Sequence, residues 1–140
     1  MSATGEADID QRIDAIEAAY EYMLAYAAQG LNGDEPGGSV TQIREELTKA
    51  EQAMDGIAGQ LRTVAQAHDP ANAARYNAFI DVLERDADIA RAAIHMVLVQ
   101  PRVSSQLIDN LNALTHLRAL LTDMFLVDEV LKIQRSASAK

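Results

Sequence analysis

The stretch LRALLTDMFLVDEVLKI, residues 117–133, decides the fold because it is too apolar for a helix that buries only one face. Eleven of its 17 residues are apolar. Five charged residues, at positions 118, 123, 128, 129 and 132, interrupt it, which is too many for a helix that crosses a membrane. We therefore expect a helix of a soluble bundle that has apolar neighbours on two sides.

At about 100° per residue, the apolar side chains of this helix fall into two stripes. The broad stripe is the expected core face and contains Leu117, Leu120, Leu121, Met124, Phe125, Val127 and Leu131. The narrow stripe lies on nearly the opposite side and contains Leu126, Val130 and Ile133. One bundle cannot cover both faces, so we predict that the narrow stripe contacts a second copy in a homodimer. The alternative is that a loop or the N-terminal arm folds over it.

Apolar residues recur at steps of three and four in the rest of the chain as well, which is typical of amphipathic helices. No segment shows the strict alternation of a strand. The pattern predicts an all-α fold with helices at about 7–30, 40–68, 70–99 and 104–134. Short connections make neighbouring helices antiparallel, so we expect an up-down-up-down four-helix bundle that forms one domain over residues 1–140.

Turn and capping residues mark the ends of these helices. The segment GLNGDEPGG, which starts at Gly30, predicts the end of the first helix and a mobile loop at 31–38. Ser39 with Gln42 forms a capping-box pattern, and Ser104 is placed to cap the last helix. Asp69 followed by a proline is typical of a helix start. We expect the tail, residues 135–140, to be frayed.

Charge is distributed unevenly along the chain. Residues 1–70 carry 13 acidic and four basic side chains, whereas residues 71–140 carry eight of each, so the net charge of −9 lies entirely in the first half. Without a basic stripe, nucleic acid and anionic membranes are not expected partners. The acidic surface predicted to face a basic protein partner consists of Asp8, Asp10, Asp14, Glu17 and Glu21. The absence of cysteine and of a signal-peptide pattern leads us to expect a cytoplasmic protein.

The sequence contains no nucleophile, phosphate-loop or catalytic-dyad motif, so we expect neither catalysis nor a cofactor. One alternative remains, a ferritin-like metal-binding or oxidoreductase bundle with an unusual set of divalent-metal ligands. Its candidate ligands are Asp81, Glu84, Asp88, His95 and His116. The Glu-x-x-His pattern of di-iron bundles is missing, because alanine stands three residues before each histidine.

One carboxylate falls on the broad stripe of the last helix. A buried carboxylate needs a partner, so we predict that Asp128 lies near a bundle end and pairs with a basic residue. Taken together, these patterns favour a non-catalytic, self-associating interaction, adaptor or scaffold-associated module. A helical chaperone that binds apolar peptides or surfaces is a third possibility.

Overall fold

A computed structural model describes residues 3–138 of the chain, and the side chains of residues 5–137. All regular structure in this range is helical, which confirms the predicted all-α class. Six α-helices are present: α1 Ala3–Ala27, α2 Gly38–Met54, α3 Ile57–His68, α4 Ala73–Leu98, α5 Ser105–Asn112 and α6 Thr115–Ser138. A short 3-10 turn, Pro70–Asn72, precedes α4.

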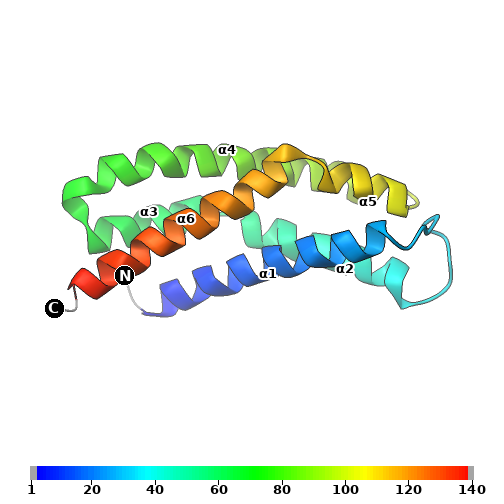
Figure 1. The fold of residues 1–140 in the computed structure, drawn as a ribbon, viewed down its shortest axis with the longest axis horizontal. Helices are drawn as coiled ribbons and strands as arrows, with labels where there is room; N and C mark the ends of the chain where they lie inside the picture. The colour runs from blue at the N-terminus through cyan, green and yellow to red at the C-terminus, as the bar shows by residue number, and fades with distance from the viewer. Residues whose placement is uncertain (1–2, 139–140) are drawn as a thin grey trace.

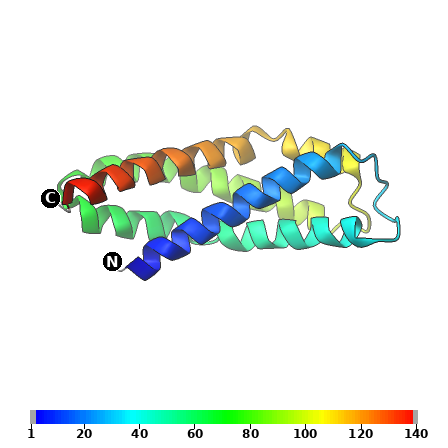
Figure 2. The ribbon, with the colours of Figure 1, turned by 60° about the horizontal axis from the view of Figure 1, so that its bottom comes forward.

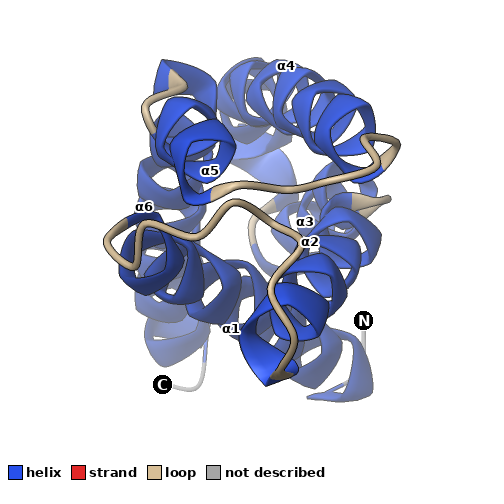
Figure 3. Ribbon diagram, turned by 90° about the vertical axis from the view of Figure 1, so that its right-hand side faces the viewer, coloured by secondary structure: helices blue, strands red, loops and turns tan. Residues whose placement is uncertain are grey.

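The long helices run along an elongated molecule, with the loop between α1 and α2 at one end and the described chain ends at the other (Figures 1 and 2). Helix α1 packs mainly on α2, and α6 packs mainly on α4. Figure 3 looks along the molecule and places α1 at the bottom and α4 at the top. All six helices contribute to one apolar core, which includes Ile16, Met23, Leu47, Leu61, Leu83, Ile94, Ile108, Leu120 and Met124.

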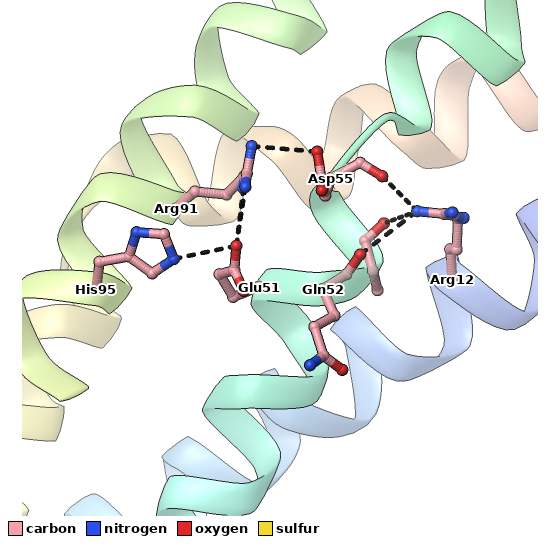
Figure 4. Close-up of polar contacts among 7 residues, drawn as sticks. Arg12, Glu51, Gln52, Asp55, Arg91 and His95 are labelled. Atoms are coloured by element: carbon pink, nitrogen blue, oxygen red, sulfur yellow. Dashed lines mark hydrogen bonds and ion pairs between the residues drawn. The ribbon is translucent and has the colours of Figure 1, made fainter.

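The helix predicted at 40–68 is broken in two, which corrects the sequence interpretation. Asp55 and Gly56 separate α2 from α3, and Gly56 has a φ of 81°, a left-handed conformation that suits glycine. Arg12 of α1 reaches the break, where its Nη1 donates to the carbonyl oxygens of Gln52 and Ala53 at 3.4 and 3.2 Å, and to that of Asp55 (Figure 4). The end of α2 is therefore capped from a neighbouring helix.

The helix predicted at 104–134 is also broken, between α5 and α6. Ser104 caps α5 as predicted, because its Oγ accepts a hydrogen bond from the backbone N–H of Leu107 at 3.0 Å. Helix α6 extends to Ser138, so residues 135–138 of the predicted frayed tail are helical, and residues 139 and 140 lie outside the described residues.

The prediction that Phe125 belongs to the core face of α6 is wrong. Phe125 is 45% exposed, whereas the other six residues of the broad stripe are buried. It follows Met124 by about 100° around the helix, beyond the edge of the face that meets the core. Its exposure adds apolar surface to the outside of α6.

The loop between α1 and α2 is attached to the segment before α5. The backbone N–H groups of Asn32 and Gly33 donate to the carboxylate of Glu35 at 2.7 and 2.8 Å. Leu31 N donates to Ser105 Oγ, and Ser105 N donates to the carbonyl oxygen of Leu31, both at 2.8 Å. These hydrogen bonds fix residues 31–33 of the loop. The mobility expected for residues 31–38 stays a prediction.

Two predicted helix starts differ from the observed ones. The capping box of Ser39 and Gln42 is wrong, because α2 already begins at Gly38 and no side chain caps its first turn. Asp69 precedes the 3-10 turn rather than α4 itself. Its carboxylate accepts hydrogen bonds from the side chains of Asn72 and Tyr76 instead of from a backbone N–H.

Candidate interaction surface

The narrow stripe of α6 is open to solvent over most of its length. Leu126 is 52% exposed, Ile133 is 58% exposed and Val130 is half-buried. The loop between α1 and α2 packs on residues 103–105 instead of on this stripe. The alternative that this loop covers the stripe is therefore wrong, and the described part of the N-terminal segment does not bury Leu126 or Ile133 either.

Helix α4 supplies a second row of apolar side chains beside this stripe. Phe79 is half-buried, and Val82, one turn further along, is 47% exposed. Phe79 of this row and Leu126 and Val130 of the stripe line a groove of about 200 Å³, whereas Val82 and Ile133 lie outside it. The other lining residues are Ala65, Arg75, Tyr76, Ile80, Val127 and Leu131. We call Phe79, Val82, Leu126, Val130 and Ile133 the α4–α6 face.

The groove has few charged side chains, and the α4–α6 face lies in the half of the chain whose charges balance. Among the residues that the structure describes, Arg75 is the one charged side chain that lines the groove. Both helices belong to the half of the chain in which acidic and basic residues are equal in number. The half with excess acid contains α1, which lies at the bottom of Figure 3 when α4 is at the top.

All five acids of the predicted acidic surface lie on α1, and their role in binding a partner stays a prediction. Asp10, Asp14 and Glu21 are exposed and Glu17 is partly exposed, at helical steps of four, three and four. Asp8 is engaged instead with its neighbours, because Gln60 Nε2 and Arg12 Nε donate to its Oδ2 at 2.5 and 3.0 Å. These two donors, Gln60 above all, hold the pKa of Asp8 below its usual value.

The five candidate metal ligands are not brought together. Asp81 and Glu84 pair with Arg62 at 2.7 and 2.8 Å, and Asp88 is exposed. The two remaining candidates, both histidines, contact other carboxylates at 3.0 Å: His95 contacts Glu51, and His116 contacts Asp86. Within residues 3–138 no three His, Asp or Glu side chains are placed to hold a metal ion, so the predicted ligands do not form a common site in this structure.

Glu51, which contacts the candidate ligand His95, takes part in ion pairs between helices. Its Oε1 accepts from Arg91 Nη2 at 2.9 Å and lies 3.0 Å from His95 Nε2, so α2 is linked to α4 beside the α2–α3 break (Figure 4). Arg91, more than His95, holds the pKa of Glu51 below its usual value. Arg91 also lies 3.5 Å from Asp55, the residue at the break.

Two buried acids lie between α4 and α6, and the sequence interpretation missed both as buried groups. Asp86 is 9% exposed and Asp123 is 8% exposed, and each carboxyl group shifts the pKa of the other through a side-chain hydrogen bond. His116 Nδ1 lies 3.0 Å from Asp86 Oδ1. Burial, followed by the neighbouring Asp86, raises the pKa of Asp123 to about 7. Burial also acts to raise the pKa of Asp86, but Asp123 and His116 outweigh it and hold that pKa below its usual value.

The predicted pairing of Asp128 is confirmed. Its Oδ2 lies 3.0 Å from Lys132 Nζ, one turn further along α6, and its side chain is 21% exposed. Asp128 also borders a small cleft with Glu6 and Arg135 near the described ends of the chain. It is therefore a partly buried, paired carboxylate.

Comparison with protein families, with curated proteins and with solved structures gives no match for this chain. Within the described part of the chain, none of the helices combines the length and the apolar character needed to span a membrane.

Proposed function

We propose that the chain is a non-catalytic interaction or adaptor module that forms a homodimer through its α4–α6 face. In this proposal the fold is an up-down-up-down four-helix bundle, in which α2 with α3 and α5 with α6 each act as one broken helix. The close packing of α1 on α2 and of α4 on α6 supports this arrangement.

One observation carries the proposal, the apolar groove between Phe79 and the pair Leu126 and Val130. Large apolar side chains exposed side by side on two helices are unusual on a monomer and are typical of an interface. A standard interface buries about 800 Å² on each partner, which needs an apolar centre and a polar rim. The α4–α6 face supplies that centre. Arg75 borders it at the groove, and Glu129 borders it beside Ile133.

Charge favours a second copy as the occupant of this groove. Two chains that each carry a net charge of −9 repel each other wherever their acidic halves meet. The α4–α6 face belongs to the balanced half, so contact through it leaves the two α1 helices on the outside of the dimer. Salt in the solution weakens the repulsion that remains between the two acidic α1 helices, since charges are screened over about 8–10 Å.

The dimer would display two acidic α1 surfaces, each formed by Asp10, Asp14, Glu17 and Glu21. A basic protein with two binding segments would engage both surfaces at once and bind more tightly than to one copy. This is the sense in which we propose an adaptor or scaffold-associated role.

Sedimentation velocity of the full chain and of Val130→Asp tests the proposal. A charge placed in the contact is expected to convert the dimer to a monomer while leaving the helical circular dichroism unchanged. Leu24→Asp is the control, because it makes a comparable change at an apolar residue of α1 that is 48% exposed and lies outside the α4–α6 face. The control is expected to remain dimeric.

Other results would overturn the proposal. A wild-type monomer that binds apolar peptides would favour the chaperone alternative. A dimer unaffected by Val130→Asp would place the interface elsewhere. Native mass spectrometry of protein purified without chelator adds a further test, because a stoichiometric metal mass would favour the metal-binding alternative.

A further inference from the structure

The buried acids Asp86 and Asp123 lie in the seam where α4 meets α6, close to the α4–α6 face. Asp123 precedes Leu126 by three residues, about one helical turn. Asp86 follows Phe79 by seven residues, about two turns, on the same side of α4. If α4 and α6 move apart at Asp86 and Asp123, the groove residues Phe79 and Leu126, one or two helical turns away, therefore move as well.

The contact between the two acids requires a proton. Two ionised carboxylates repel strongly when they meet in a buried, low-dielectric environment, so one of them must be neutral. Oδ2 of Asp123 is buried and receives no hydrogen bond from any N–H or hydroxyl group of the described residues. Asp86, in contrast, lies 3.0 Å from Nδ1 of His116 and accepts a hydrogen bond from it in every form of the ring that carries a hydrogen on Nδ1. The arrangement therefore places the proton on Asp123 and the negative charge on Asp86.

Among the described residues, no arginine or lysine makes an ion pair with Asp86 or Asp123, so His116 is the one basic group in contact with the pair. Arg85 on α4 is exposed and lowers the pKa of Asp86, but it does not alter that of Asp123. Arg62 of α3 is bound to Asp81 and Glu84. In the described part of α1, α3 and α5, no charged side chain makes an ion pair or hydrogen bond with either acid. Loss of the proton would therefore leave two adjacent charges without a partner for Asp123.

We infer that Asp86, His116 and Asp123 form a proton-dependent latch that holds α4 against α6 and thereby controls the α4–α6 face. In the closed latch, neutral Asp123 donates to Asp86 while His116 donates to the same carboxylate. When Asp123 loses its proton, the two carboxylates repel, α4 and α6 separate locally, and the groove is distorted. The effect on dimerisation depends on the proposed function, whereas the latch itself does not.

The direction of the pH effect follows from the raised pKa of Asp123, about 7. The latch is closed below that pH and opens above it, so self-association is expected to weaken as the solution becomes more alkaline. This range includes neutral pH, where small changes in acidity would alter the population of closed latches.

The experiment uses the full chain as wild type, Asp123→Asn and Asp109→Asn, at about pH 6 and about pH 8.5. Asparagine at position 123 stays neutral and still offers a donor to Asp86, so the latch should remain closed at both pH values. Asp109 is an exposed acid on α5 and gives the same charge change away from the seam. Asp86→Asn is a second variant that removes the repulsion from the other side, in case Asp123→Asn folds poorly.

Two readouts are measured for each protein. Sedimentation velocity gives the dimer dissociation constant, which is expected to rise on the order of tenfold for wild type, the change that corresponds to one pKa unit. Hydrogen–deuterium exchange, corrected for intrinsic rates, is expected to accelerate at residues 119–127 of α6 at the higher pH. Both changes should be absent in Asp123→Asn and retained in Asp109→Asn.

The outcomes separate this inference from the proposed function. Equal pH responses of wild type and Asp123→Asn in both readouts would overturn the latch. A chain that is monomeric at every pH, yet shows the exchange difference, would overturn the dimer and support the latch. A dimer of constant affinity that shows the exchange difference would support the latch and overturn its control of the face.

Discussion

Arg12 Nη1 of α1 lies 3.2 Å from the carbonyl oxygen of Ala53, in the last turn of α2. The break between α2 and α3 interrupts the helical hydrogen bonding there. The carbonyl oxygen of Gln52 still accepts from the backbone N–H of Asp55, and one guanidinium group donates to the carbonyl oxygens of Gln52, Ala53 and Asp55. Arg12→Ala is expected to lower the free energy of unfolding by about 1.5–3 kcal/mol, the range for hydrogen bonds to a charged group. Urea denaturation followed by circular dichroism measures the change.

Arg118→Ala is the control for this substitution. Arg118 is an exposed arginine on α6, and a surface change of this kind is expected to stay within about 0.5 kcal/mol. Similar losses in the two variants would show that the general loss of positive charge, rather than the cap, is responsible.

The close approach of Gly33 to Val103 predicts a second stability effect. A Cβ atom at Gly33 would lie 2.8 Å from backbone atoms of Val103, whereas one at Gly37 would meet nothing within 4 Å. Both glycines have positive φ, 98° and 124°, so alanine is strained at either position. Gly33→Ala should therefore destabilise the protein by about 1–3 kcal/mol more than Gly37→Ala, as overpacking does. Thermal unfolding of the two variants gives the difference, and equal melting temperatures would contradict the contact.

The hydroxyl of Tyr26 links the end of α1 to the segment before α5. It donates to the carbonyl oxygen of Val103 at 2.6 Å from a fully buried ring. Tyr26→Phe leaves that carbonyl oxygen without this donor and is expected to cost about 1–3 kcal/mol. Tyr22→Phe serves as the control, because its longer bond, 3.3 Å to Ser39, lies where water can replace it. An equal loss of stability in Tyr22→Phe and Tyr26→Phe would show that burial of the Tyr26 hydroxyl does not set the cost of removing it.

The sequence was sufficient to predict the helical class and most of the core, because apolar spacing records which face of a helix is buried. It did not reveal the break at Asp55 and Gly56. Met54 and Ile57 continue the apolar stripe across the break and both are buried, so the periodicity shows no interruption. The cap from Arg12 comes from a residue more than 40 positions away, and local patterns contain no information on it.

The buried acids were missed for a related reason. Asp123 lies at the edge of the core face of α6. Whether a residue at such an edge is exposed to solvent depends on which helix packs against it, here α4. Asp86 follows Leu83 and precedes Ala87 and Ala90 in the buried stripe of α4, and this was a usable signal that the position faces inward. The exposure of Leu126 and Ile133, in contrast, follows from helical spacing within α6 alone, without reference to a neighbouring helix.

The titration of the acid pair provides the last prediction. Carboxyl carbon shifts measured by NMR are expected to give Asp123 a midpoint near 7 and Asp86 one below its usual 3.8. Because folding raises the pKa of Asp123, the stabilisation that its proton gives to the folded state is complete below pH 3.8. This stabilisation is lost as the pH rises to about 7. For Asp86 the sign is opposite, because its contribution is present above 3.8 and is lost in stronger acid. The free energy of unfolding of wild type relative to Asp123→Asn should therefore fall between about pH 4 and pH 7, and a flat difference would contradict the shared proton.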